Sequence, residues 1–109
     1  MQRNKIYSYV GFARRAGKFK AGMNAIKTVK KGVELLILCK SASPNAVKEA
    51  KNLSERFFCP LYMTKAFTVE EMVDKENCKL VAILDCELAK AIISNAGEDL
   101  EEISGGRNE

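Results

Sequence analysis

The residues best suited to chemistry in this chain are amide, hydroxyl and ammonium groups that recur at helical spacing after Gly22. A helix would carry them on one face, because Asn24, Lys27, Thr28 and Lys31 stand at positions i, i+3, i+4 and i+7. Lysine ammonium groups bind phosphates, and an asparagine amide can hydrogen-bond base edges. Gly22 precedes the helix start, where free backbone N–H groups favour a phosphate. The pattern predicts a surface that contacts nucleic acid.

Two interpretations of this surface fit the spacing equally well. In the first, Lys20, Lys27 and Lys31 neutralise phosphates while Asn24 contacts a base edge. In the second, Asn24 caps the helix and the lysines are solvated charges on its outer side.

Positive charge is concentrated in the first half of the chain. Residues 1–56 contain 13 Lys and Arg against 3 Asp and Glu, whereas residues 57–109 contain 5 against 11, and the net charge is +4. Segregated signs indicate a polyanionic partner, and we expect this partner to be nucleic acid. A solvated surface is the alternative, but single-sign fields are uncommon without a steering role. Lys18 and Lys20 lead into the candidate helix and join the predicted surface.

Residue types that support catalysis or metal binding are scarce. The chain has no histidine, no glycine-rich phosphate loop and no Gly-x-Ser-x-Gly motif. Cys39, Cys59, Cys78 and Cys86 form no Cys-x-x-Cys pair, so we expect free, buried thiols and no zinc site. We therefore expect no enzyme, no metal and no cofactor. A small enzyme that uses Asp85 and a cysteine is an alternative, although Asp85 is better explained as a helix cap.

Length and composition suit one globular domain. The chain has 109 residues, of which 47% are hydrophobic and 29% are charged. Its longest apolar stretch, residues 33–39 with one interruption, is far shorter than the roughly 20 residues that cross a bilayer. The basic N-terminus lacks the apolar run of a signal peptide. We expect a cytoplasmic protein without a membrane span.

Hydrophobic spacing alternates between helical and strand-like along the chain. Helices are expected over residues 6–16, 23–31, 44–57, from 68 to about 75, and over 86–96, and strands over residues 18–21, 35–39, 61–63 and 80–84. Ser43, the pair Thr68 and Glu71, and Asp85 are expected to cap the last three helices. Gly17 and Gly32 are expected to end the first two.

This alternation predicts an α/β fold, a three-layer α-β-α sandwich around a central mixed sheet of about four strands. Residues 1–97 form the predicted domain. Residues 98–109 are acidic and contain Gly105 and Gly106, so we expect a frayed C-terminal tail there.

Four segments in order resemble the ribosomal protein L-seven-Ae family, in particular its bacterial YlxQ-like branch. They are GFARRAGK at 11–18, GMNAIK at 22–27, LLILCKSASP at 35–44 and LVAILDCELAKAI at 80–92. The likeness covers about residues 4–96. It implies an α-β-α sandwich that binds kink-turn RNA, a bent duplex with tandem sheared G·A pairs, and implies no catalysis.

The resemblance also implies where RNA would bind. The family's RNA-binding helix begins Gly-x-Asn-Glu-x-x-Lys. Aligned on Gly22, Asn24 matches the asparagine, Ala25 replaces the glutamate and Lys27 comes one position early; aligned on Lys27, Met23 replaces the asparagine. A second family contact, after the central strand, maps to Lys40 and Ser41, and a third, an apolar loop, maps near residues 64–67. The predicted RNA-binding residues are Lys18, Lys20, Gly22, Asn24, Lys27, Thr28, Lys31 and Lys40.

These observations predict a non-enzymatic, cytoplasmic protein that binds structured RNA, either ribosomal or regulatory, with ribosomal proteins as neighbours. The alternative is a protein-interaction module on the same sandwich. Its acidic second half, with Glu70, Glu71, Asp74 and Glu87, would then contact a basic partner.

Overall fold

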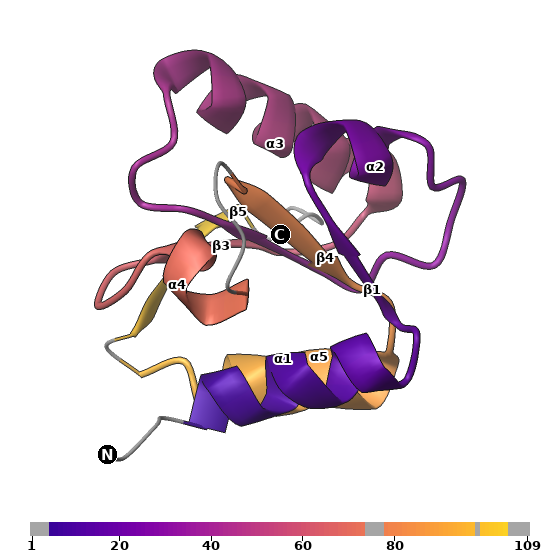
Figure 1. The fold of residues 1–109 in the computed structure, drawn as a ribbon. Coiled ribbons are helices and arrows are strands. Elements are labelled where there is room, and N and C mark those ends of the chain that lie inside the picture. The colour runs from indigo at the N-terminus through magenta and orange to yellow at the C-terminus, as the bar shows by residue number, and fades with distance from the viewer. Residues whose placement is uncertain (1–4, 74–77, 98, 105–109) are drawn as a thin grey trace.

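Helices and strands alternate along the described chain, as the hydrophobic spacing predicts. The computed structural model describes residues 5–73, 78–97 and 99–104. Its helices are α1 (Lys5–Arg15), α2 (Met23–Lys27), α3 (Pro44–Phe57), α4 (Val69–Val73) and α5 (Cys86–Ser94). Its strands are β1 (Phe19–Ala21), β2 (Leu35–Leu38), β3 (Leu61–Thr64), β4 (Leu80–Ile83) and β5 (Leu100–Ser104) (Figure 1).

The strands form one mixed sheet in the order β1-β4-β2-β3-β5. β2 and β3 pair in parallel, whereas the other three pairs are antiparallel. Every residue of β2 and β4 is buried, as expected for internal strands that are covered on both faces. The predicted α-β-α sandwich with a mixed sheet is confirmed, with five strands instead of about four.

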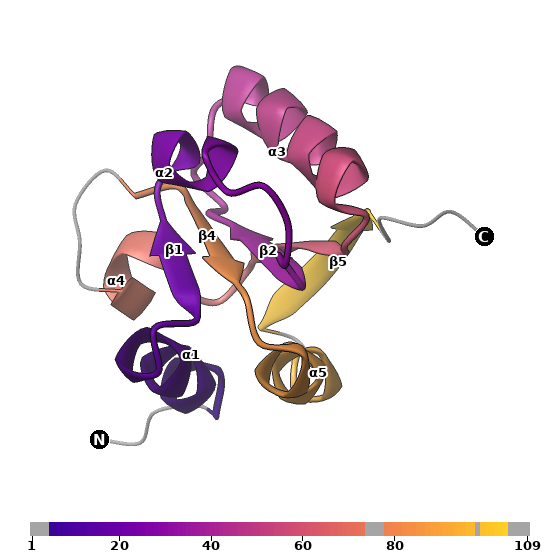
Figure 2. The ribbon, with the colours of Figure 1, turned by 90° about the vertical axis from the view of Figure 1, so that its right-hand side faces the viewer.

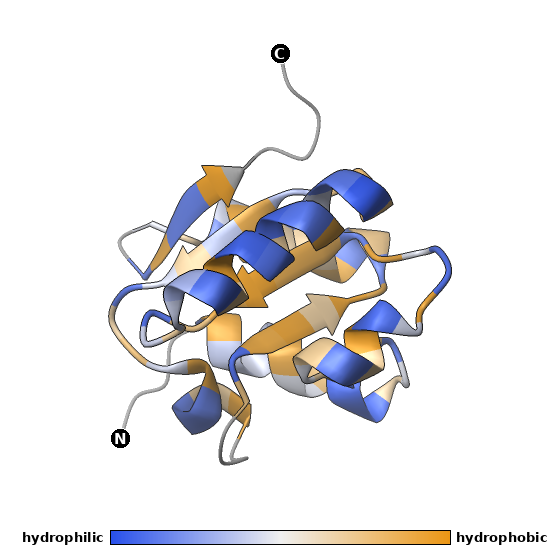
Figure 3. Cartoon of the chain, turned by 90° about the horizontal axis from the view of Figure 1, so that it is seen from above, coloured by the Kyte–Doolittle hydropathy of each residue, from blue (hydrophilic) through white to orange (hydrophobic). Residues whose placement is uncertain are grey.

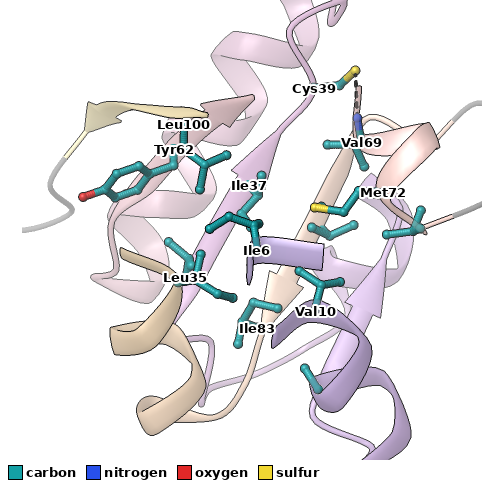
Figure 4. Close-up of a cluster of buried hydrophobic side chains, with 14 of the residues drawn as sticks. Ile6, Val10, Leu35, Ile37, Cys39, Tyr62, Val69, Met72, Ile83 and Leu100 are labelled. Atoms are coloured by element: carbon teal, nitrogen blue, oxygen red, sulfur yellow. Dashed lines mark hydrogen bonds between the residues drawn. The ribbon is translucent and has the colours of Figure 1, made fainter. Parts of the chain in front are cut away.

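Helices cover both faces of the sheet and enclose two cores. α1, α4 and α5 lie on one face, and α2 and α3 lie on the other (Figures 1 and 2). Successive residues of β2 point to opposite faces, so Ile37 joins the core under α1 and Leu38 joins the core under α3. Figure 4 shows the first of these cores, where Ile6 of α1 lies beside Ile37. Hydrophobic strands alternate with helices whose outer sides are largely hydrophilic (Figure 3).

The predicted caps of the last three helices are confirmed. The Ser43 hydroxyl accepts a hydrogen bond from the Ala46 N–H at 3.1 Å. Thr68 and Glu71 form a reciprocal capping box, in which each backbone N–H donates to the other's side chain at 3.0 and 3.1 Å. The Asp85 carboxylate accepts from two N–H groups in the first turn of α5. These hydrogen bonds fix where α3, α4 and α5 begin.

The second helix is shorter than predicted. It ends at Lys27, because the Thr28 and Val29 N–H groups bond to carbonyls three residues back, at 3.3 and 3.0 Å. The Thr28 hydroxyl also donates to the Ala25 carbonyl at 2.7 Å. Met23, Ile26 and Val29 still pack in the core under α3. A spacing of three residues therefore identified the buried side but not the length of the helix.

The expectation of a frayed tail is wrong for Leu100–Ser104, which forms β5. This strand pairs antiparallel with β3 and supplies partners for a backbone edge that would otherwise be open. Leu100 is buried in the core under α1, while Glu101 and Glu102 are exposed. Charged residues on an edge strand are a common protection against further strand pairing. Residues 98 and 105–109 lie outside the described part.

Two smaller findings concern the membrane and the thiols. No helix of the described residues is long and apolar enough to cross a bilayer. No disulfide joins the four cysteines; Cys39, Cys59 and Cys78 are buried as expected, but Cys86 is exposed. The exposure of Cys86 follows from its position in the first turn of α5, directly after the Asp85 cap.

Candidate nucleic-acid interface

Strand directions bring several polar segments to one edge of the sheet. β1 and β2 are both antiparallel to β4, and β3 is parallel to β2, so β1, β2 and β3 point the same way. Their C-terminal ends lead into Gly22, Lys40 and Lys65. We call this side, which also includes Lys79 at the start of β4, the carboxyl edge. The Gly22 N–H bonds to the Leu80 carbonyl at 2.8 Å, which ties the start of α2 to it.

Gly22 has a backbone conformation that other residues rarely adopt. Its φ is 99° and its ψ is 141°, in a region open mainly to glycine. No heavy atom other than those of its chain neighbours lies within 4 Å of the point that a Cβ would occupy. The glycine is therefore required by the turn from β1 into α2, and the space in front of it is open.

Asn24 presents a free amide beside this turn. The N-cap of α2 is Gly22, and the helix has no side-chain cap, so the interpretation of Asn24 as a cap is wrong. Asn24 is exposed and forms no hydrogen bond through its side chain with any described residue. With five residues, α2 has only a small dipole, so the side chains and not the helix terminus supply the binding groups.

Lys27 faces α3 and is already paired. Its Nζ lies 3.3 Å from the Glu49 carboxylate, and the two side chains are 44% and 36% exposed. Such an exposed ion pair contributes at most about 1 kcal/mol, so a phosphate could replace Glu49. Lys31 lies beyond the end of α2, and the Thr28 hydroxyl is engaged in a hydrogen bond to the Ala25 carbonyl at that end. The predicted continuous face of four residues is therefore reduced to Asn24 and Lys27.

Lysines from three strands meet at the carboxyl edge. Lys40 Nζ donates to the Lys65 carbonyl at 3.3 Å, and the Lys40 N–H donates to the Thr64 hydroxyl at 3.0 Å. Lys79 Nζ donates to the Ser41 hydroxyl at 2.9 Å and forms an ion pair with Glu70 at 3.2 Å. Lys40 was predicted from the sequence, whereas Lys65 and Lys79 were not. Their positions in the sequence could have identified them, because Lys65 directly follows β3 and Lys79 directly precedes β4, both at the carboxyl edge.

A buried thiol lies beneath this edge. Burial raises the pKa of Cys39, but hydrogen bonds from Ser41 and the Val69 N–H, together with the charge of Lys79, lower it below the usual 9.0. Cys39 has no exposed surface. Its sulfur lies 3.1 Å from the Ser41 hydroxyl oxygen, so the thiol helps to hold the loop that follows β2. Asp85 follows β4 at the opposite edge and is not brought to this thiol.

The remaining predicted residues are dispersed. Lys20 lies in the middle of β1, opposite Ala82, and therefore points to the α2 side of the sheet. Lys18 lies before β1, where its carbonyl accepts the Leu84 N–H at 2.9 Å, so it belongs to the opposite edge. Lys31 lies in the loop between α2 and β2. Of the eight predicted residues, Gly22, Asn24 and Lys40 gather at the carboxyl edge, with Lys20, Lys27 and Thr28 beside it.

The acidic residues of the alternative hypothesis do not form one surface. Glu70 pairs with Lys79 and Glu71 caps α4, close to the carboxyl edge. Glu87 lies in the first turn of α5, which follows β4 at the opposite edge. Asp74 lies outside the described residues.

The carboxyl edge thus combines a free amide, an open glycine turn and lysines from separate strands. This arrangement can neutralise a bent chain of phosphates while one amide reaches a base. No protein-family model and no curated protein sequence matches this chain.

Proposed function

We propose that this chain is a non-enzymatic protein that binds structured RNA with a kink-turn or a similar bend. The carboxyl edge is its contact surface. The observation that carries the proposal is that β1, β2 and β3 all end at that edge, where Lys40 contacts Lys65 and where the turn at Gly22 leads into Asn24. Lysines at these positions would contact phosphates, and the Asn24 amide would contact a base edge.

A bent RNA fits this surface better than a regular duplex. In an A-form helix the major groove is deep and narrow, so side chains cannot reach the base edges in it. Asn24 is a short side chain on a five-residue helix and cannot enter such a groove. A kink opens the groove and turns base edges outward, where the amide could reach them. Lys20 and Lys27 would then flank the contact on the same side of the sheet.

The resemblance to the ribosomal protein L-seven-Ae family supports the same RNA class. In the alignment on Gly22, Asn24 matches the family's asparagine, and Lys40 lies at the family contact after the central strand, where it replaces the acidic residues common in the family and extends the basic surface. A cytoplasmic location, a ribosomal or regulatory RNA, and ribosomal proteins as neighbours belong to this proposal.

The test is a titration of two labelled RNA duplexes of equal length and charge, one with a kink-turn and one straight. We expect tighter binding of the kinked duplex and a log-log salt slope near about −4 to −5, for about 4 to 6 neutralised phosphates. Asn24→Ala should reduce the preference for the kinked duplex. Lys40→Gln should weaken binding to both and make the slope shallower by about 0.9.

Lys90→Gln provides the matched control, because Lys90 is exposed on α5, across the sheet from α2. It removes the same charge and should have a smaller effect than Lys40→Gln. Equal binding of the two duplexes by the wild-type protein would overturn the proposal for bent RNA. Unchanged binding by both Asn24→Ala and Lys40→Gln would overturn the proposed surface.

A further inference from the structure

A second basic surface lies at the C-terminal end of α1. Phe12 is 49% exposed there, although large hydrophobic side chains are normally buried. The Arg15 guanidinium lies 5.2 Å from the centre of the Phe12 ring, and the Arg14 guanidinium lies 5.9 Å from that of Phe19. An open cavity of about 450 Å³ is lined by Gly11, Arg14 and Arg15.

The cations of this surface have no carboxylate partner in the described part of the chain. Among the residues that the structure describes, no carboxylate lies within 4 Å of Arg14, Arg15 or Lys18. In contrast, Lys79 at the carboxyl edge and Lys27 beside it each have a carboxylate partner. The α1 surface therefore has positive charge available for a polyanion.

Gly11 keeps the cavity open at a cost to the helix. Glycine inside a helix destabilises it relative to alanine. Packing does not demand a glycine, because a Cβ at this position would meet only Arg15 Nη1, at an ordinary distance of 3.6 Å. A bare backbone here does permit a ligand to approach α1 closely.

This surface is separate from the carboxyl edge. Lys18 lies before β1 and Gly22 follows it, so the three residues of β1, about 10 Å of extended chain, lie between the two sites. Figure 2 shows α1 and α2 at opposite ends of β1. One nucleotide at the carboxyl edge cannot occupy both.

We propose that the α1 surface is a second RNA site, which binds an unpaired nucleotide of a single strand. The base stacks on Phe12 and the neighbouring Arg15 guanidinium, and the flanking phosphates bind Arg14 and Lys18. An exposed aromatic ring among cations is the usual combination in single-strand binding, because every base has a stacking face. An acidic peptide would use the cations but would leave the ring without a partner. This proposal goes beyond the proposed function and does not depend on it.

The test uses a fluorescently labelled single-stranded RNA decamer at low salt, with inorganic polyphosphate as a polyanion without bases. We expect Phe12→Leu to weaken decamer binding by about 5-fold or more and to leave polyphosphate binding unchanged, because leucine keeps apolar bulk but cannot stack a base. Arg14→Gln should make the salt slope for the decamer shallower by about 0.7. Lys51→Gln, which removes an exposed charge from α3 on the other face, is the matched control.

Two outcomes would overturn this second site. One is a Phe12→Leu variant that binds the decamer as tightly as the wild-type protein. The other is a wild-type protein that does not bind the decamer at low salt. Thermal unfolding of Phe12→Leu should match that of the wild type, so a lost signal cannot be attributed to misfolding. Binding of the kinked duplex without overhangs should be unaffected by Phe12→Leu, and binding of the decamer should be unaffected by Asn24→Ala, which distinguishes the two proposals.

Discussion

Replacement of Glu49 by glutamine should make RNA binding tighter. Glu49 holds Lys27 Nζ at 3.3 Å, and both side chains are more than a third exposed. A phosphate that binds Lys27 must displace this carboxylate, which costs about 0.2–1 kcal/mol for an exposed pair. It must also tolerate a second negative charge about 7 Å away, which costs about 0.6 kcal/mol in water. Without the carboxylate, affinity should rise by about 4- to 15-fold at low salt, and by less at physiological salt.

Fluorescence anisotropy with the kinked duplex at several salt concentrations measures this change. Glu55→Gln is the matched control, because it raises the net charge of the protein equally and Glu55 has no ion pair with a described lysine or arginine. In a Lys27→Gln background, the gain in affinity from Glu49→Gln should fall to the part that comes from removing the repulsion between the Glu49 carboxylate and the phosphate. If Glu49→Gln gains no more affinity than Glu55→Gln, or gains the same with and without Lys27, then Lys27 does not bind a phosphate of the RNA.

Further substitutions test the stability of the fold. Gly22→Ala should lower the free energy of unfolding in urea by about 1–3 kcal/mol, because its φ of 99° strains any side chain; an unchanged midpoint would contradict this account. Ser43→Ala and Asp85→Ala should each cost about 1 kcal/mol through loss of a helix cap, whereas the threonine and asparagine variants should keep most of it. Burial, with a smaller contribution from Glu34, raises the pKa of Cys59 to about 12 from 9.0, so the folded state holds this proton more tightly. The contribution of the protonated Cys59 thiol to the free energy of unfolding is therefore complete below pH 9 and is lost as the pH rises towards 12. In urea titrations over that pH range, Cys59→Ala should lose less stability than the wild-type protein.

The helix starts illustrate what could be predicted without a structure. Ser43, Thr68 and Asp85 each cap the helix that follows them, as expected. A cap joins groups two or three residues apart, so its signal is complete within a short window of sequence. The buried strands β2 and β4 were also predictable, because continuous apolar runs have few other places in a small domain.

The candidate site was predicted less well, for a physical reason. Helical spacing suggested one face from Asn24 to Lys31, but the turn at Thr28 ends α2 before that face is complete. The tail composition suggested fraying, but the open edge of β3 recruits Leu100–Ser104 as a fifth strand. The end of α2 depends on local hydrogen bonds that compete with the helix, and β5 depends on a partner strand that is distant in sequence. The apolar periodicity of the sequence predicts neither.

Local sequence is enough to specify the alternation of helices and strands, the helix starts and the concentration of positive charge in the first half. How that charge is divided between two surfaces depends on the tertiary fold. Strand directions bring Lys40, Lys65 and Lys79 to one edge with Asn24, while Lys18 lies at the other with the end of α1. The basic residues are divided in this way because strand pairing joins segments that are dozens of residues apart. The pairing uses backbone N–H and C=O groups, which differ little between residue types, so the side-chain sequence does not specify it directly.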